Sequence, residues 1–316
     1  HGHNNLRGAT LFPHNIALGS TRNPDLVKSI GNVTAKEVLA SGLDLTFSPA
    51  ISVPRDDRWG RTYEGFSEDP AIVSLLGVAM VKGLQGELSS NFMSNETILA
   101  TAKHYIGDGG TERGIDKGNT VLNEDRLMAI HGIGYQKTIN AGIQVIMASF
   151  NSWNGIKMHG NSYLINDILK SKMGFDGFVL GDWNGHMEVE GCSVDNCPKA
   201  INSGIDMFMV TDAWKELYKN TLEQVISGAI KRQRLDDAVK RIIRVKLRSN
   251  LFEKGVPSKR KYSGNKSIIG SKEHRDIARK AVRESLVLLK NNNNVLPLNP
   301  SKKILVLGKA ANNIKQ

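Results

Sequence analysis

An aspartate and a tryptophan stand where a buried strand of this sequence is expected to end. Residues 177–181 (GFVLG) form a short apolar run, and Asp182-Trp183 follow it directly. An ionised aspartate can attack or support the anomeric carbon of a sugar, and an indole face can stack on a pyranose ring. The pair therefore indicates sugar chemistry. The alternative from the residues alone is that Asp182 is the N-cap of a helix that follows the strand.

Three further polar segments contain side chains suited to binding sugar hydroxyls. Residues 54–70 read PRDDRWGRTYEGFSEDP, residues 103–110 read KHYIGDGG, and residues 147–155 read MASFNSWNG. Lysine and arginine donate charge-assisted hydrogen bonds, and they favour the ionised form of a neighbouring carboxylate. The side chains of adjacent Lys103 and His104 cannot point the same way in a regular strand, so we expect the strand to bend or end there. The alternative is that the pair is a solvated strand end with no role in binding.

The elements that must position these residues alternate between strands and helices. Asn23-Pro24 and Asp69-Pro70 each combine a capping side chain with a first-turn proline, which predicts helix starts. The expected strands are 43–51, 99–105, 142–150, 177–181 and 205–210. The expected helices are 24–41, 70–85, 124–141, 162–172, 198–203, 213–228 and 235–251. Apolar strands followed by helices, without a glycine-rich phosphate loop, favour a parallel sheet in a (β/α)8-type TIM barrel.

The chain divides into three expected parts. Residues 1–252 are interpreted as a TIM-barrel catalytic domain that is incomplete at its N-terminus. Residues 253–302 are a linker and a connecting helix over 272–290, and residues 303–316 begin an α/β sandwich domain with a strand at 303–307. The first residues, His1-Gly2-His3, and the apolar run near the end suggest a piece excised from a longer protein.

Composition excludes several classes of protein. Of 316 residues, 40% are hydrophobic and 23% charged, which is typical of a globular chain and not of a disordered one. No run of 18 apolar residues occurs, so no membrane span is expected. The net charge of +11 is uneven, because residues 231–316 hold 23 basic and 6 acidic side chains. We interpret this basic end as solvated helix faces rather than a nucleic-acid site, because it lacks stacking aromatics and any DNA-binding motif.

Taken in order, these motifs resemble glycoside hydrolase family 3, the β-glucosidase and exo-β-glucanase family. HGHNN, RWGRTYEGFSED, KHYIGDGG, SWNG and GDW follow the family pattern from residue 1 to about residue 311. The resemblance implies hydrolysis of terminal non-reducing β-D-glucosyl residues from β-glucans or from cello- and laminari-oligosaccharides. It also implies a retaining double-displacement mechanism, and no cofactor or metal is expected.

The same resemblance assigns roles to individual residues. Asp182 matches the catalytic nucleophile. The residues assigned to the substrate are Arg61, Lys103, His104, Met147 and Trp183. Other readings remain open at this point. Arg61 could be a structural partner of Glu64 or Glu68, and Asp108 could serve only to shape a glycine-rich turn.

Departures from the family pattern limit what the chain is expected to do alone. The family's acid/base glutamate belongs to the sandwich domain, so no residue here is assigned that role, and the isolated chain is expected to be nearly inactive. A non-catalytic carbohydrate-binding barrel is the alternative. Phe150 replaces a frequent tyrosine, and Gly181 replaces the usual serine before the nucleophile. Asp108 stands where the N-acetylglucosaminidase branch has histidine, which argues against that activity.

Two cysteines bear on the compartment. Cys192 and Cys197 are separated by four residues in the segment after the nucleophile. They could form a small-loop disulfide or remain two thiols, and the spacing fits no common zinc site. A disulfide would indicate an oxidising compartment. Because β-glucans are extracellular, we expect a periplasmic or extracellular protein.

Overall fold

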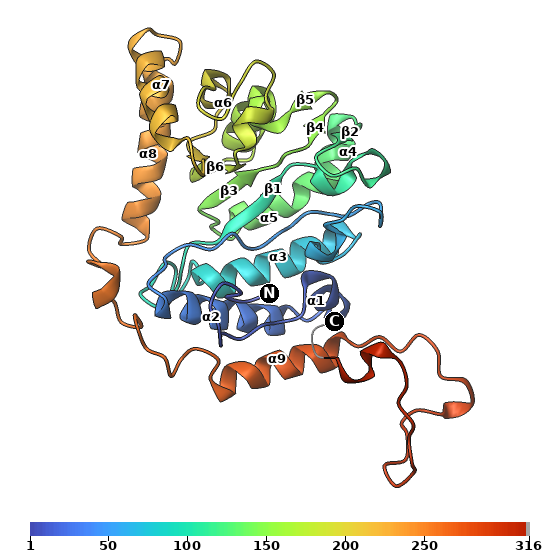
Figure 1. Ribbon diagram of the computed structural model, residues 1–316. Helices are drawn as coiled ribbons and strands as arrows, with labels where there is room; N and C mark the ends of the chain where they lie inside the picture. The colour runs from blue at the N-terminus through green and yellow to red at the C-terminus, as the bar shows by residue number, and fades with distance from the viewer. Residues whose placement is uncertain (314–316) are drawn as a thin grey trace. The chain divides into compact units, whose positions relative to one another are not determined.

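Parallel strands form the centre of this computed structural model, which describes residues 1–313 (Figure 1). The strands β1 (Thr101–Tyr105), β3 (Val145–Ala148), β6 (Phe178–Trp183) and β7 (Met207–Met209) lie side by side in that order, all parallel. Residues 44–51, where a strand is predicted, are not assigned as one, but they run parallel to residues 99–103 through two isolated bridges and five backbone hydrogen bonds. The predicted α/β class and parallel sheet are confirmed. Within residues 1–313 these strands form an open sheet, and the closed barrel stays a prediction.

The helix starts predicted from capping residues are confirmed. α2 (Pro24–Ala40) begins after Asn23, whose side chain accepts a hydrogen bond from the Leu26 amide. α3 (Pro70–Gln85) begins after Asp69, which caps the Ala71 amide in the same way. The two helices run side by side along one face of the sheet (Figure 1). This is the packing expected where each parallel strand is followed by a helix.

The remaining elements connect the strands and cover the sheet. The α-helices are α1 (Asn15–Thr21), α4 (Glu124–Leu127), α5 (Ile133–Asn140), α6 (Pro198–Asn202), α7 (Trp214–Ile226), α8 (Arg232–Arg248) and α9 (Lys272–Ser285). Two segments have π-helical hydrogen bonds, η4 (Met128–Gly132) and η6 (Tyr163–Lys172). Short helical turns are η1 (Thr62–Glu64), η2 (Asp108–Gly110), η3 (Glu112–Gly114), η5 (Met158–Gly160), η7 (Gly185–Glu188) and η8 (Pro257–Lys259). A small second sheet contains β2 (Asn119–Thr120), β4 (Ser152–Trp153) and β5 (Ile156–Lys157).

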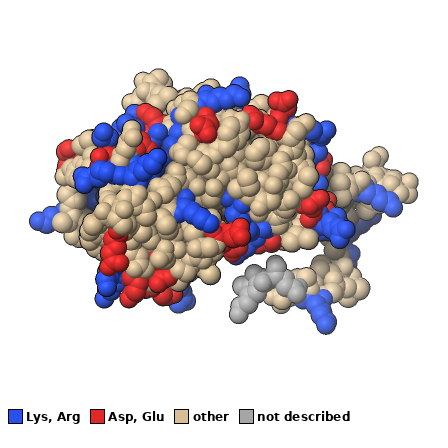
Figure 2. Space-filling view, turned by 90° about the horizontal axis from the view of Figure 1, so that it is seen from above, with Lys and Arg blue, Asp and Glu red and all other residues tan. Residues whose placement is uncertain are grey.

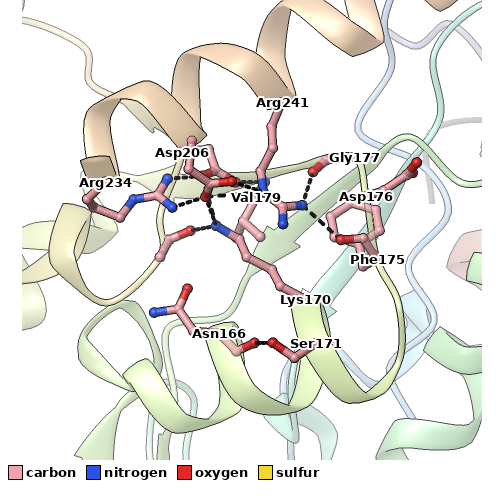
Figure 3. A network of polar contacts seen from close by, with 12 residues as sticks. Asn166, Lys170, Ser171, Phe175, Asp176, Gly177, Val179, Asp206, Arg234 and Arg241 are labelled. Atoms are coloured by element: carbon pink, nitrogen blue, oxygen red, sulfur yellow. Dashed lines mark hydrogen bonds and ion pairs between the residues drawn. The ribbon is translucent and has the colours of Figure 1, made fainter. Parts of the chain in front are cut away.

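A buried ionic network attaches α8 and η6 to the sheet (Figure 3). The Asp206 carboxylate is fully buried and pairs with Lys170 at 2.8 Å and with Arg234. Its second oxygen accepts a hydrogen bond from the Val179 amide at 2.8 Å. Further along α8, Arg241 donates to two carbonyls in the turn before β6. Because every buried charge here has a partner, the network fixes the helix that flanks the strand carrying Asp182.

A second unit begins at Leu286. The helix expected over 272–290 ends at Ser285, and the strand expected at 303–307 is wrong, because the structure assigns no strand there. A strand needs hydrogen bonds to a neighbour, and 303–307 has none in the described part of the chain. This unit contains only the turns η9 (Asn292–Asn294) and η10 (Lys309–Asn312) among its described residues. Residues 314–316 of the expected third part lie outside the described residues.

Surface charges are mixed on the face shown in Figure 2, where basic and acidic side chains are interspersed. That view shows no continuous basic patch. Among residues 1–313, no helix combines the length and the apolar character needed to cross a bilayer.

Candidate functional site

The Asp182 carboxylate lies at the C-terminal end of β6, with one oxygen hydrogen-bonded and the other buried and unpaired among the described residues. Its side chain is 12% exposed. Oδ1 accepts a hydrogen bond from the Trp183 amide at 2.7 Å. Oδ2 has no hydrogen-bond partner among residues 1–313 and lies 3.7 Å from His104 Nε2. One carboxylate oxygen is therefore held by the chain, and the other is a buried oxygen whose lone pairs no described residue uses.

His104 is oriented by an arginine on one side and an aspartate on the other. Arg61 Nη2 lies 2.8 Å from His104 Nε2, and Asp108 Oδ2 lies 2.8 Å from His104 Nδ1. Because a guanidinium can only donate, Nε2 is the acceptor and Nδ1 carries the proton. The hydrogen bonds thus assign one neutral tautomer to the imidazole beside Asp182.

Asp108 has a larger role than the turn-shaping one considered from the sequence. It is buried and also accepts hydrogen bonds from Ser52 Oγ at 2.7 Å and from the Gly109 amide at 2.9 Å. Burial alone would raise the pKa of Asp108, but the His104 and Ser52 bonds and the Arg61 charge bring it below its ordinary value. The sequence signal for this role was the four-residue spacing of His104 and Asp108 in KHYIGDGG.

Arg61 combines a structural and a site contact. It forms a two-point ion pair with Glu64, at 2.7 Å and 3.1 Å, while it also reaches His104. The structural reading of Arg61 is thus correct for Glu64, and it does not remove the residue from the site. Burial would lower the pKa of Arg61, but Glu64, Asp108 and Asp182 together raise it above the ordinary value. The guanidinium is a fixed positive charge beside the candidate nucleophile.

Lys103 supplies a second positive charge, and its ammonium is unengaged. No hydrogen bond or ion pair joins its Nζ to any of residues 1–313. Burial lowers the pKa of Lys103, although the Glu64 and Asp182 carboxylates oppose that shift. The pairing of β1 with β3 shifts register between Ala102 and Tyr105, so the predicted irregularity at Lys103-His104 is confirmed. The ammonium is free to donate to a bound hydroxyl.

A cavity of about 390 Å³ adjoins this charged cluster. Its polar lining residues include His1, His14, Asn15, Thr46, Ser48, Arg61, Tyr63, Glu64 and Lys103. Asp182, His104 and Trp183 are not among them. The cavity therefore meets the site along Arg61 and Lys103 rather than enclosing the candidate nucleophile.

Trp183 and Met147, both selected from the sequence, have opposite environments. The Trp183 side chain is 63% exposed at the end of β6. Met147 is 2% exposed, pairs with Leu180 and packs in an apolar cluster of the sheet. Trp183 is thus free to cover a ligand, whereas Met147 lies in packing below the polar groups and is not brought into their hydrogen-bond network.

Cys192 and Cys197 form a disulfide in the structure, with their Cα atoms 4.8 Å apart. The alternative of two thiols, left open by the sequence, does not apply to this structure. The bond closes the loop that follows η7, close in sequence to Trp183. Among residues 1–313, no group of three or more His, Cys, Asp or Glu side chains is arranged to hold a metal ion.

Comparisons with known proteins agree with the family suggested by the motifs. The model of the glycosyl hydrolase family 3 N-terminal domain matches residues 1–245. The crystal structure of an exo-1,3/1,4-β-glucanase from a Pseudoalteromonas species is similar, with 52% identity and a TM-score of 0.96, over 98% of this chain and 39% of that one. A β-xylosidase of Formosa agariphila is 34% identical over 93% of this chain and 42% of its own length. A periplasmic β-glucosidase of Salmonella typhimurium is 32% identical over 96% and 40%. The chain spans about two fifths of the length of these relatives.

Proposed function

The chain belongs to glycoside hydrolase family 3, and from that premise we propose that it carries the nucleophile of a retaining β-glucosidase or exo-β-glucanase. The observation that supports this most is the place of the Asp182 carboxylate at the end of β6, where its buried Oδ2 lies beside His104 with no hydrogen-bond partner among the described residues. A retaining glycosidase needs a carboxylate nucleophile that is held rigidly. Arg61 and Lys103 are the positive groups that interact electrostatically with Asp182.

The proposed reaction has two steps. A carboxylate oxygen of Asp182 attacks the anomeric carbon, a carbon–oxygen bond forms to the enzyme, and the bond to the leaving oxygen breaks as that oxygen takes a proton from an acid. Water then attacks the same carbon, loses its proton to the conjugate base and releases the sugar with retained configuration. Lys103 and Arg61 would donate to sugar hydroxyls, and Trp183 would cover one face of the ring.

The acid is not assigned to a residue of this chain. The two other carboxylates near Asp182 are already engaged, Asp108 by His104 and Glu64 by Arg61. A group in such contacts is poorly suited to donate a proton to a leaving oxygen. We propose that the acid comes from a further domain, such as the sandwich domain implied by the family resemblance. Substrates whose leaving groups need no proton then report on Asp182 alone.

The proposed substrate class is a neutral β-glucoside or β-glucan oligosaccharide. It is supported by the similar exo-1,3/1,4-β-glucanase and periplasmic β-glucosidase. The similar β-xylosidase makes a β-xyloside the second candidate. We also propose that the open parallel sheet belongs to a (β/α)8 barrel. A periplasmic or extracellular location is supported by the disulfide and by the periplasmic relative.

Hydrolysis of 2,4-dinitrophenyl β-glucoside by the protein in its natural full length tests the proposal. Asp182→Asn is expected to lower kcat by at least about 10³-fold, because it removes the nucleophile. Asp176→Asn is the matched control, since Asp176 is an exposed carboxylate that pairs with Arg248. If Asp182→Asn keeps more than a tenth of the activity, Asp182 is not the nucleophile. Faster turnover of the β-xyloside would favour the second candidate.

A further inference from the structure

The backbone of Asp182 lies at a break in the sheet. Pairing of β6 with β3 ends at Leu180, which is opposite Met147. On the other side, pairing of β6 with β7 shifts register between Leu180 and Trp183. The Asp182 amide, between these two points, does not donate to a neighbouring strand. A partly buried amide at such a break still needs another acceptor, and that acceptor controls where the side chain begins.

That acceptor is a histidine from a different loop. The Asp182 amide donates to His159 Nε2 at 2.9 Å. His159 lies in η5, after the β4–β5 hairpin, and it is 1% exposed. The backbone of Ser149, the residue that follows β3, lies close enough to raise the pKa of His159. The ring therefore connects the end of β3 with the end of β6 at the level where the strands themselves no longer pair.

The protonation of His159 suits it to accept. Burial lowers the pKa of His159 to about 3, and the neighbouring His186 acts in the same direction. The imidazole is therefore neutral at any ordinary working pH. An imidazolium would have no lone pair for the amide, whereas the neutral ring accepts at Nε2 and can donate from Nδ1.

The position of the ring is enforced by close packing. A Cβ placed on Gly185 would lie 2.4 Å from the Cε1 and Nε2 atoms of His159. A glycine is therefore required at this place for the ring to reach the Asp182 amide. The sequence contained no recognisable signal for this role, because His159 is 23 residues from Asp182 and lies outside the SWNG motif.

We infer that His159 is a positioning residue for Asp182, whose ring replaces the missing strand neighbour and fixes the nucleophile's backbone. The inference rests on the proposed function only for its kinetic consequence. The carboxylate has one oxygen held by the Trp183 amide and one buried oxygen without a partner among the described residues. Once the backbone is fixed, the carboxylate can move only by rotation about χ1 and χ2. Loss of the His159 bond should slow attack more than it weakens sugar binding.

The kinetic test uses inactivation by 2-deoxy-2-fluoro-β-glucosyl fluoride, whose leaving group needs no acid. In the full-length protein, His159→Leu is expected to lower the inactivation rate constant about 10- to 100-fold with Ki changed less than about threefold. His159→Gln, whose side-chain oxygen can accept the same amide, should return the rate to within about fivefold of the wild type. Gly185→Ala keeps the histidine but displaces its ring, and should slow inactivation like His159→Leu.

Hydrogen exchange of the Asp182 amide gives a second measurement that does not depend on activity. His159→Leu should speed this exchange at least about tenfold. His274→Leu is the matched control, because His274 is also buried but bonds to Glu37 between α9 and α2. It should leave both the exchange and the inactivation rate unchanged. Equal exchange and equal inactivation in wild type and His159→Leu would overturn the inference. A wild type that is never inactivated would overturn the proposed function, and the exchange would still decide the role of His159.

Discussion

Asp108→Asn tests most sharply how His104 is oriented. Asparagine offers one acceptor oxygen and one amide donor, whereas Asp108 accepts from Ser52, His104 and the Gly109 amide. If the asparagine oxygen accepts from His104, the side-chain NH2 group points at the Gly109 N–H. If the side-chain amide is flipped, its NH2 group points at the His104 Nδ1–H instead. Reversing the imidazole tautomer gives no relief, because Nε2–H would then face the Arg61 donors. Every arrangement leaves at least one buried donor unpaired.

The expected size follows from that count. An unpaired buried donor costs about 1–3 kcal/mol, and replacing a charge-assisted hydrogen bond by a neutral one adds about 1 kcal/mol. We therefore expect Asp108→Asn to lower the free energy of unfolding by about 2–4 kcal/mol. If part of this free energy is lost from transition-state stabilisation rather than from folding, each loss of about 1.4 kcal/mol slows inactivation by the fluoro-glucosyl reagent about tenfold. Ser52→Ala is the matched control, since it removes one donor and keeps the His104 bond, and should cost less than about 1.5 kcal/mol.

The pH dependence of stability should show that Asp108 stabilises the fold in its ionised form. The pKa of Asp108 is held below its ordinary value, so its carboxylate contributes stability above about pH 4, and that contribution is lost as the pH falls through the folded-state value. The difference between wild type and Asp108→Asn in urea unfolding should be largest near neutral pH and shrink in acid. A variant within about 0.5 kcal/mol and twofold of the wild type at neutral pH would refute this reasoning.

Three further outcomes concern the scaffold around the site. Asp206→Asn should lower the free energy of unfolding by about 3–5 kcal/mol in urea titrations, because Lys170 and Arg234 lose a fully buried partner; a loss below about 1 kcal/mol would contradict a paired buried network. Burial lowers the pKa of Lys170 to about 8, so the folded state releases this proton earlier than the unfolded state, and the free energy of unfolding should rise from about pH 8 to about pH 10; Lys170→Met should remove that rise. Reduction of the Cys192–Cys197 bond should cost about 2 kcal/mol in denaturant unfolding, as its loop is short, and a Cys192→Ser protein should show no response to reductant.

Features that depend on local chain chemistry were predictable from the sequence. The pairs Asn23-Pro24 and Asp69-Pro70 predicted the starts of α2 and α3, because a capping residue and a first-turn proline act within a few residues. The strand before Asp182 was also found, although it extends to Trp183 rather than ending at residue 181. The expected strand at 303–307 failed because apolar character alone does not supply a pairing neighbour.

The candidate site was predictable in part. The family motifs selected Arg61, His104 and Asp182, and the structure brings these three side chains together. The hydrogen bonds that orient them were not visible. The role of Asp108 required knowing the tautomer of His104, and the role of His159 required knowing that two loops meet where the strands stop pairing. Such contacts depend on tertiary packing and leave no spacing pattern in the sequence.

Peptide mapping after inactivation tests the central claim most directly. The full-length protein would be treated with 2-deoxy-2-fluoro-β-glucosyl fluoride, digested and analysed by mass spectrometry. The account predicts one covalent glycosyl adduct, on Asp182, that is absent from Asp182→Asn and present in Asp176→Asn. An adduct on a different carboxylate, or none in a folded protein that still hydrolyses β-glucosides, would contradict the assignment of Asp182 as the nucleophile.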